Sequence, residues 1–275
     1  EYEEFYPLSK LGGVAVKGMT LLEKAGNPPP RIAETPSGML NSVGLQNPGI
    51  DYFIEHELPN LIHKDTRIIA NVAGSTAEDC VTIAQKLEPT AVDMIELNIS
   101  CPNVKQGGAA FGISCSSAAD ITAKVRKATT KPLMVKLSPN VTSISEIAKA
   151  VEAAGADAVS LINTLLGMKI DINTRRPVLK NNVGGLSGPA VFPVALRMVW
   201  QVANAVSIPV VGMGGIEKWQ DAVEMLLAGA SALQMGAAIF ADPYAPLKVI
   251  DGLNEYLDSH NIGKVTELVG KVQPW

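Results

Sequence analysis

The stretch E-L-N-I-S-C-P-N-V-K-Q-G-G, residues 96–108, is the most informative part of the chain. An apolar strand predicted over residues 91–97 leads into a loop that carries Cys101 among amide and hydroxyl side chains. Pro102 ends the strand, and Gly107 and Gly108 give the loop conformational freedom. A lone cysteine is most often a core residue, so this stretch by itself leaves both a structural and a chemical role open.

Around this loop the chain repeats one pattern, a short β-branched run followed by a helical stretch rich in alanine, lysine and glutamate. Seven runs predict strands, at residues 13–17, 67–73, 93–99, 133–137, 158–163, 209–212 and 232–236. The helices predicted between them cover residues 77–87, 117–129, 143–154, 189–205 and 219–228. Repeated βα units favour a parallel sheet with helical crossovers.

An eighth strand would close such a sheet into a barrel, and the natural place for it is before Glu1, since the chain opens without a methionine. We therefore predict the α/β class and a (β/α)8 TIM barrel whose first strand is missing from this chain. Residues 1–275 are predicted to form one domain that is incomplete at its N-terminus, because no linker or low-complexity tract divides them.

Strand periodicity decides between this barrel and a doubly wound sheet. In a barrel, alternate strand residues point inward, and those at the C-terminal ends build the active site. Five strands then place a polar residue there, namely Lys17, Asn71, Asn98, Lys136 and Asn163. Their apolar neighbours would face the outer helices: Val16, Val72, Leu97, Ile99, Val135, Leu137 and Ile162. Because buried lysines and amides need partners, the pattern favours a polar ligand over five separately satisfied structural residues.

The last two predicted strands each run into a glycine turn, V-G-M-G-G-I at 211–216 and L-Q-M-G-A-A at 233–238. Barrels often bind phosphate at the loops after strands seven and eight, where glycines let backbone N–H groups approach the oxygens. The two turns therefore predict a phosphate site. Neither matches the dinucleotide fingerprint or the P-loop.

Composition and residue spacing exclude several classes of function. The net charge of −4 makes nucleic acid and anionic membranes poor partners. No apolar run approaches the roughly 20 residues that span a bilayer, and we expect a cytoplasmic protein without a membrane segment. Cys80, Cys101 and Cys115 show no C-x-x-C pairing, which argues against a zinc site or iron–sulfur cluster here and fits a reducing cytosol.

The histidines also lie away from the predicted strand ends, which disfavours a histidine-ligated metal or a Ser-His-Asp triad. We therefore predict no metal in this chain. A cysteine, amides, lysines and a phosphate site remain. This combination suits a flavin mononucleotide (FMN) enzyme that acts on a small, polar, anionic substrate.

With these motifs together, the chain resembles a class 1 dihydroorotate dehydrogenase along essentially its whole length. The resemblance is most specific at G-N-P-P-P-R (26–31), M-L-N-S-V-G-L-Q-N-P-G (39–49), N-I-S-C-P-N-V (98–104) and V-G-M-G-G-I (211–216). The stretch at 28–41 and the loop K-Q-G-G-x-x-F-G (105–112) look closer to the NAD-linked class 1B than to the fumarate-using class 1A. The family fold is a (β/α)8 barrel, in agreement with the strand count.

The resemblance implies oxidation of (S)-dihydroorotate to orotate in de novo pyrimidine (UMP) biosynthesis. Cys101 would be the base that removes a proton from C5, while the hydride at C6 passes to N5 of FMN. A free thiol titrates at about 8.5, so a thiolate base needs a positive or hydrogen-bonding environment, for which Lys17 is a candidate. The residues that resemble the family's substrate contacts are Lys17, Asn41, Val43, Gly44, Leu45, Asn98, Asn103, Asn163 and Thr164.

The resemblance also implies an FMN site. Its residues would be Lys17, Gly18, Asn71, Asn98, Lys136, Ile162, Gly188, Gly214, Gly215, Gly236 and Ala237. Lys136 would lie by the N1–O2 edge of the flavin, and the last four residues would hold the phosphate through N–H groups. The family commonly has threonine where Ala237 stands, so we expect weaker phosphate binding here. It also begins some tens of residues earlier, with a strand and a turn that touches FMN.

Class 1B further implies a second subunit that carries FAD and a [2Fe–2S] cluster and passes electrons to NAD+. The assembly would be a catalytic homodimer flanked by two such subunits, a heterotetramer. The alternatives are a class 1A fumarate-linked enzyme, a lyase or aldolase with a Schiff base on Lys136, and a truncated barrel that only binds FMN or a partner. A degradative pyrimidine dehydrogenase domain is disfavoured by the loop at 101–104.

Overall fold

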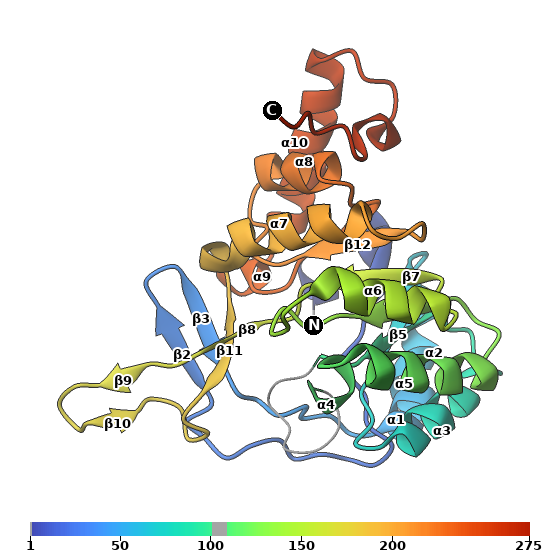
Figure 1. The fold of residues 1–275 in the computed structure, drawn as a ribbon, viewed down its shortest axis with the longest axis vertical. Helices are drawn as coiled ribbons and strands as arrows, with labels where there is room; N and C mark the ends of the chain where they lie inside the picture. Colours follow the sequence, from blue (N-terminus) through green and yellow to red (C-terminus); the bar gives the residue numbers. More distant parts are fainter. Residues whose placement is uncertain (1, 101–108) are drawn as a thin grey trace.

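Seven parallel strands form the main sheet of the computed structural model, which describes residues 2–100 and 109–275 (Figure 1). The strands are β1 (Gly13–Ala15), β4 (Arg67–Val72), β5 (Met94–Asn98), β6 (Leu133–Lys136), β7 (Ala158–Leu161), β12 (Val210–Met213) and β13 (Ala232–Gln234). All seven predicted strands are therefore confirmed, although β1, β7 and β13 end two residues earlier than predicted.

The strands of this sheet lie side by side in chain order, β1-β4-β5-β6-β7-β12-β13. A doubly wound sheet reverses its order at a switch point, whereas a barrel winds in one direction only. The observed order is therefore that of a barrel wall. In the part of the chain that the structure describes, β1 and β13 are the edges of the sheet, so the eighth strand stays a prediction.

Six longer helices follow the strands and pack against one another in the same order. They are α3 (Ala77–Leu87), α5 (Cys115–Ala128), α6 (Ile144–Ala153), α7 (Phe192–Ala203), α8 (Trp219–Leu227) and α10 (Ala245–Ser259). The first five confirm the predicted helices, except that residues 189–191 form a separate 3-10 turn before α7. Within residues 2–100 and 109–275, no helix is both long and apolar enough to cross a membrane.

The structure also contains shorter helical segments. They are α1 (Ile50–Tyr52), a π-helical turn (Phe53–Glu57), α2 (Leu58–Leu61), α4 (Ala109–Gly112), α9 (Ala238–Ala241) and 3-10 turns at Tyr2–Glu4, Leu8–Lys10, Pro189–Val191 and Val265–Leu268. Local sequence explains where the longer helices begin. Thr76 accepts a hydrogen bond from the N–H of Asp79 at 3.0 Å, and the Asp79 carboxylate accepts one from the N–H of Thr76. This capping box satisfies N–H groups that the first turn of α3 leaves unpaired.

The hydrophobic core lies between the main sheet and its helices. Of the strand residues predicted to face outward, Val72, Leu97, Ile99, Val135 and Leu137 are fully buried in it. Val16 and Ile162 contact the core but also line the cavity at the strand ends, so their outward orientation is not confirmed. Burying each such side chain stabilises the fold by about 1.5–3 kcal/mol. The other face of these strands is thereby left to the polar residues that alternate with them.

A second, antiparallel sheet flanks the main one and was not predicted. Its strands, in the order β2-β3-β11-β8, are β2 (Ile32–Thr35), β3 (Gly38–Asn41), β11 (Gly184–Ser187) and β8 (Leu165–Gly167). A two-stranded ribbon, β9 (Ile170–Asp171) with β10 (Arg176–Pro177), extends beyond it at the left of Figure 1. Asn41 on β3 lies opposite Gly185 on β11, so this sheet joins distant parts of the chain. Asn41 and residues 43–45 thereby lie at the strand ends of the main sheet.

Glu88, just past the end of α3, fastens that helix to the loop before β6. Its carboxylate accepts hydrogen bonds from the hydroxyl of Thr129 and from the hydroxyl and N–H of Thr130, the N–H at 3.0 Å. These bonds lower the pKa of Glu88 from 4.5 to about 2, and the bond from the Thr129 side chain has the largest effect. A carboxylate with a lowered folded-state pKa stabilises the fold above its unfolded pKa, and this stability is lost as the pH falls toward the folded value.

We therefore predict that Glu88→Gln lowers the Tm at neutral pH. The gap to the unmodified protein should shrink as the pH falls below 4.5 toward 2, because the parent then loses the same interaction. Differential scanning fluorimetry across this range measures it. Glu146→Gln, which changes an exposed side chain paired with Lys149, is the control and should have little effect. A Tm gap that does not depend on pH contradicts the prediction.

Candidate functional site

A cavity of about 520 Å³ opens at the C-terminal ends of the main-sheet strands. Each of the seven strands contributes lining residues at or just past its end, from Lys17 after β1 to Gly236 after β13. The small sheet contributes a further part of the wall through Asn41 at the end of β3 and Ser187 at the end of β11. Parallel strands end at one edge of a sheet, so this is where their terminal side chains meet.

Every sequence-predicted site residue that the structure describes lines this cavity. These residues are Lys17, Gly18, Asn41, Val43, Gly44, Leu45, Asn71, Asn98, Lys136, Ile162, Asn163, Thr164, Gly188, Gly214, Gly215, Gly236 and Ala237. The two remaining predictions, Cys101 and Asn103, lie outside the described residues. The structure thus brings the described residues together, while the binding role of each stays a prediction.

Strand register explains why the polar residues are neighbours. Asn71 on β4 lies opposite Glu96 on β5, and Asn98 lies opposite Lys136 on β6. Lys136 in turn lies opposite Ser160 on β7. Polar side chains on adjacent strands therefore form a continuous lining on the inner face of the sheet. The residues that alternate with them along each strand point to the other face.

Hydrogen bonds join several of these side chains. The Asn98 amide donates to Asn71 Oδ1 at 3.3 Å and accepts from the N–H and hydroxyl of Ser100 at 3.1 and 2.9 Å. Asn163 donates to the Ser100 hydroxyl at 2.8 Å and accepts from the N–H of Thr164 at 2.7 Å. Because these bonds fix the amides before any ligand binds, little side-chain entropy remains to be lost on binding.

Lys136 differs from these amides. Its side chain is half-buried in the cavity wall, and within residues 2–100 and 109–275 it has no hydrogen bond or ion pair. A partly desolvated ammonium group without a counter-charge is unfavourable. A ligand with an anionic or electron-rich edge would therefore be stabilised beside it.

The glycine turns after β12 and β13 form the opposite part of the wall. Gly214 and Gly215 have φ values of 120° and 76°, in the left-handed region that favours glycine. A Cβ on Gly215 would lie 2.8 Å from the backbone oxygen of Gly188 and from the backbone nitrogen of Phe192. At Gly236, by contrast, a Cβ would meet no atom within 4 Å. Gly214, Gly215 and Gly236 all line the cavity, so none of these three residues places a side chain between its backbone and a phosphate.

Sequence reasoning overlooked Glu96, Ser160 and Gln234. The Glu96 carboxylate is 1% exposed and accepts hydrogen bonds from Asn71, from the Ser160 hydroxyl at 2.7 Å and from the Gln234 amide at 3.4 Å. The sequence did contain a signal for Glu96: it precedes Asn98 by two residues, and a strand period of two places both on the same face of β5. A carboxylate inside an otherwise apolar strand needs such partners.

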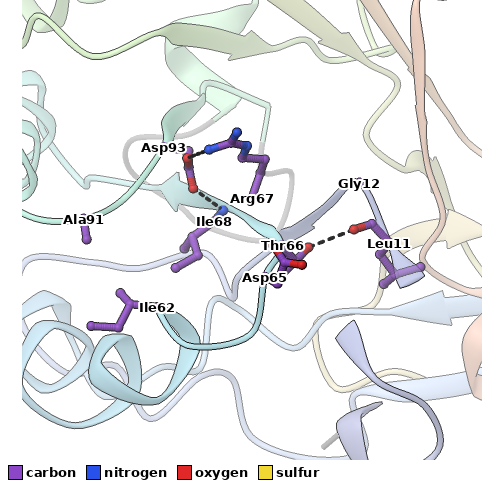
Figure 2. Close-up of a pocket in the computed structure, with 9 residues that line it drawn as sticks. All are labelled: Leu11, Gly12, Ile62, Asp65, Thr66, Arg67, Ile68, Ala91 and Asp93. Atoms are coloured by element: carbon purple, nitrogen blue, oxygen red, sulfur yellow. Dashed lines mark hydrogen bonds and ion pairs between the residues drawn. The ribbon is translucent and has the colours of Figure 1, made fainter. Parts of the chain in front are cut away.

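A second cavity, of about 460 Å³, lies at the opposite end of β1 and β4 (Figure 2). Its polar groups already bind one another: Asp93 accepts from Arg67 and from the N–H of Ile68, each at 2.8 Å, and Thr66 donates to the Leu11 carbonyl at 3.0 Å. Burial would raise the pKa of Asp93, but the bonds from Ile68 and Arg67 outweigh it, so the pKa is lowered. Because Arg67 is already paired with Asp93, this cavity is the weaker candidate for an anionic ligand.

The described cysteines and histidines lie away from the strand-end cavity. Cys80 is buried in α3, and burial raises the pKa of its thiol to about 12. Cys115 is exposed at the start of α5. None of the three histidines lines the cavity. In the described ranges, 2–100 and 109–275, no cluster of three His, Cys, Asp or Glu side chains could hold a metal ion.

Known proteins are similar to the chain over nearly its whole length. The family model described as dihydroorotate dehydrogenase matches residues 1–257. A relative from Parabacteroides distasonis is 58% identical over 271 residues, 98% of this chain and 89% of its own. Relatives from Bacteroides thetaiotaomicron and Alkaliphilus oremlandii are 56% and 54% identical, each covering 99% of this chain and 90% of their own. All three are named dihydroorotate dehydrogenase B (NAD(+)), catalytic subunit.

Proposed function

The chain belongs to the dihydroorotate dehydrogenase family, class 1B, and from this premise we propose that it oxidises (S)-dihydroorotate to orotate with bound FMN, in pyrimidine biosynthesis. The observation that carries the proposal is the meeting of Asn71, Asn98, Lys136 and Asn163 in one cavity at the strand ends. A polar ligand explains this arrangement because Lys136 lacks a partner among the described residues, and a buried charge needs one.

The residues present in the cavity fit FMN. Its volume of about 520 Å³ lies within the range of cofactor sites, and the backbone of Gly214, Gly215, Gly236 and Ala237 at the cavity wall suits a phosphate. Lys136 would neutralise negative charge at the edge of the ring. The remaining contacts would come from Lys17, Gly18, Asn71, Asn98, Ile162 and Gly188. When bound, FMN supplies the hydride acceptor that no amino-acid side chain can provide.

Amides suit the proposed substrate. The edge of a dihydropyrimidine alternates N–H and C=O groups; an Asn amide can donate to a C=O group and, where its oxygen is not already occupied, accept from an N–H group. Asn98 and Asn163 are already held by hydrogen bonds, so they would orient the ring without reorganising. Asn41, Asn103, Thr164 and the backbone of Val43, Gly44 and Leu45 would complete this contact, and Lys17 would offset the substrate's negative charge.

Proton removal would fall to Cys101. Its thiolate would take the proton from C5, and the electron pair of that C–H bond would become the C5=C6 double bond as hydride leaves C6. Ser100 precedes it, is fully buried, and donates both its hydroxyl and its N–H to Asn98. The residue before Cys101 is therefore anchored to the cavity wall, which supports this assignment.

The same family membership extends the proposal to the assembly. The word subunit in the relatives' names implies a partner, which we propose carries FAD and a [2Fe–2S] cluster and passes electrons to NAD+. A catalytic homodimer with two such partners, in the cytoplasm, completes the proposal. Within it, residues 1–275 form one domain, and the seven parallel strands belong to a (β/α)8 barrel.

The experiment that tests this function is anaerobic mixing of FMN-saturated protein with dihydroorotate. The flavin absorbance band should bleach as the cofactor is reduced, and orotate should appear in equal amount. FMN-loaded protein whose spectrum does not change with dihydroorotate would contradict the proposal and favour a barrel that only binds the cofactor.

Changing Cys101 to Ala should slow flavin reduction roughly 10²- to 10⁴-fold, the usual contribution of a positioned base. The Kd of orotate should change far less, because the one hydrogen left on C5 of orotate is vinylic and no base has to remove it. Stopped-flow absorbance gives the rate and a spectral titration gives the Kd. Cys115→Ala alters an exposed thiol and is the matched control. If the rate of flavin reduction and the affinity for orotate fall by the same factor, Cys101 is not the base.

Gly236→Ala should weaken FMN binding about tenfold, equivalent to about 1.4 kcal/mol. The added Cβ meets no protein atom within 4 Å, so the protein alone tolerates it, while the phosphate loses its close approach. Fluorescence titration of FMN measures the Kd, and the Tm of the FMN-free variant checks the fold. Gly12→Ala is the matched control, because that site is equally open but lines the cavity of Figure 2. An unchanged Kd contradicts the phosphate site.

A further inference from the structure

Glu96 is a buried carboxylate that the proposed reaction does not use. It lies on β5 two residues before Asn98, is 1% exposed, and has no ion pair within residues 2–100 and 109–275. Its hydrogen-bond donors come from three other strands: Asn71 on β4, Ser160 on β7 and Gln234 on β13. Neutral donors alone compensate its desolvation, so Glu96 holds together strands that are far apart in the sheet.

A carboxylate can only accept hydrogen bonds, and this imposes a direction on its neighbours. Asn71 turns its Nδ2 group to Glu96, so its Oδ1 faces the other way and accepts from Asn98. The opposite orientation of the Asn71 amide would place a carbonyl oxygen against the carboxylate, which is repulsive. The carboxylate therefore decides which atom Asn71 presents to Asn98.

The direction continues along the lining of the cavity. Once Nδ2 of Asn98 faces Asn71, its Oδ1 faces Ser100 and accepts from the N–H and the hydroxyl of that residue at 3.1 and 2.9 Å. The Ser100 hydroxyl, having donated its proton, accepts from Asn163 Nδ2 at 2.8 Å. Every donor in the series Asn163, Ser100, Asn98, Asn71 thus points toward Glu96.

We infer that Glu96 is a positioning residue that fixes which hydrogen-bonding groups Asn98 and Asn163 present to the substrate. The inference rests on the proposed function, which assigns these two amides to the pyrimidine ring. Both lone pairs of Asn98 Oδ1 are occupied by Ser100. Within residues 2–100 and 109–275 nothing accepts from the second N–H of its amide, which is therefore the group available to a ligand. Asn98 therefore selects an acceptor, a carbonyl or carboxylate oxygen, and it does so because the series ends in a carboxylate.

The test is the effect of Glu96→Gln on orotate affinity in FMN-saturated protein, measured by the change that orotate causes in the flavin spectrum. Glutamine keeps the size of the side chain but can donate as well as accept, so Asn71 and Asn98 are free to turn around. The Kd of orotate should rise about tenfold or more, as expected when a hydrogen bond to a charged ligand is lost. Glu146→Gln makes the same substitution at an exposed site and should leave the Kd unchanged.

A double-mutant cycle separates positioning from general damage. If Glu96 acts through Asn98, Glu96→Gln should add almost nothing to the Kd of a protein that already carries Asn98→Ala. A merely structural role predicts that the two losses multiply, and that result overturns the inference. An unchanged Kd in the single variant also overturns it.

Two further outcomes are distinguishable. Failure of the unmodified, FMN-loaded protein to bind orotate would contradict the proposed function, and the role of Glu96 with it. If Glu96→Gln does not fold, Asn71→Leu interrupts the same series one residue further on while Ser160 and Gln234 still bind Glu96. Asn71→Leu must then raise the orotate Kd about tenfold or more, and it must add almost nothing to the Kd of a protein that already carries Asn98→Ala. An unchanged Kd in Asn71→Leu overturns the inference.

Discussion

Parallel strands in chain order are the constraint on which the rest of the structure depends. Because all seven run in one direction, their C-terminal ends meet at a single edge, and one cavity receives a contribution from each. The period of two then divides the residues. Leu97 and Val135 pack against the helices, while Asn98 and Lys136, the next residue along each strand, face the cavity. Core and site are therefore two faces of the same strands, and a shift of register would disrupt both.

Sequence alone was sufficient for the features that depend on local pattern. Strand alternation gave Asn71, Asn98 and Lys136 a common face, and the structure places them around one cavity. The small sheet could not be predicted in this way. Its strands are short and contain several glycines, and β3 pairs with β11 across more than a hundred residues. Nothing within either segment indicates that pairing.

Glu96 shows a different limit of sequence reasoning. Its position on the inner face of β5 followed from Asn98, yet its importance depends on which side chains the other strands bring to it. Ser160 and Gln234 are unremarkable in the sequence, and only the fold places both within hydrogen-bond distance of one carboxylate. Cys101 and Asn103, which motif resemblance alone assigns, lie outside the described residues, so their roles rest on family membership and on the anchored Ser100.

The electrostatics of the cavity agree with an anionic ligand. Lys136 has an ammonium group without a partner in the described part of the chain, whereas Glu96 is surrounded by donors. The buried negative charge of Glu96 is thus satisfied within the protein, while the positive charge of Lys136 is left for a ligand. Cys80 provides a contrast to the proposed base, since burial holds its pKa at about 12 and keeps that thiol protonated.

The most direct test of this account is a crystal structure of the protein with FMN and orotate. We predict the flavin ring beside Lys136 and Asn71, its phosphate at the glycine turns after β12 and β13, and orotate against Asn98 and Asn163. An acceptor oxygen of orotate should face the free N–H of Asn98. FMN or orotate bound elsewhere, for example in the cavity around Arg67 and Asp93, would contradict the account.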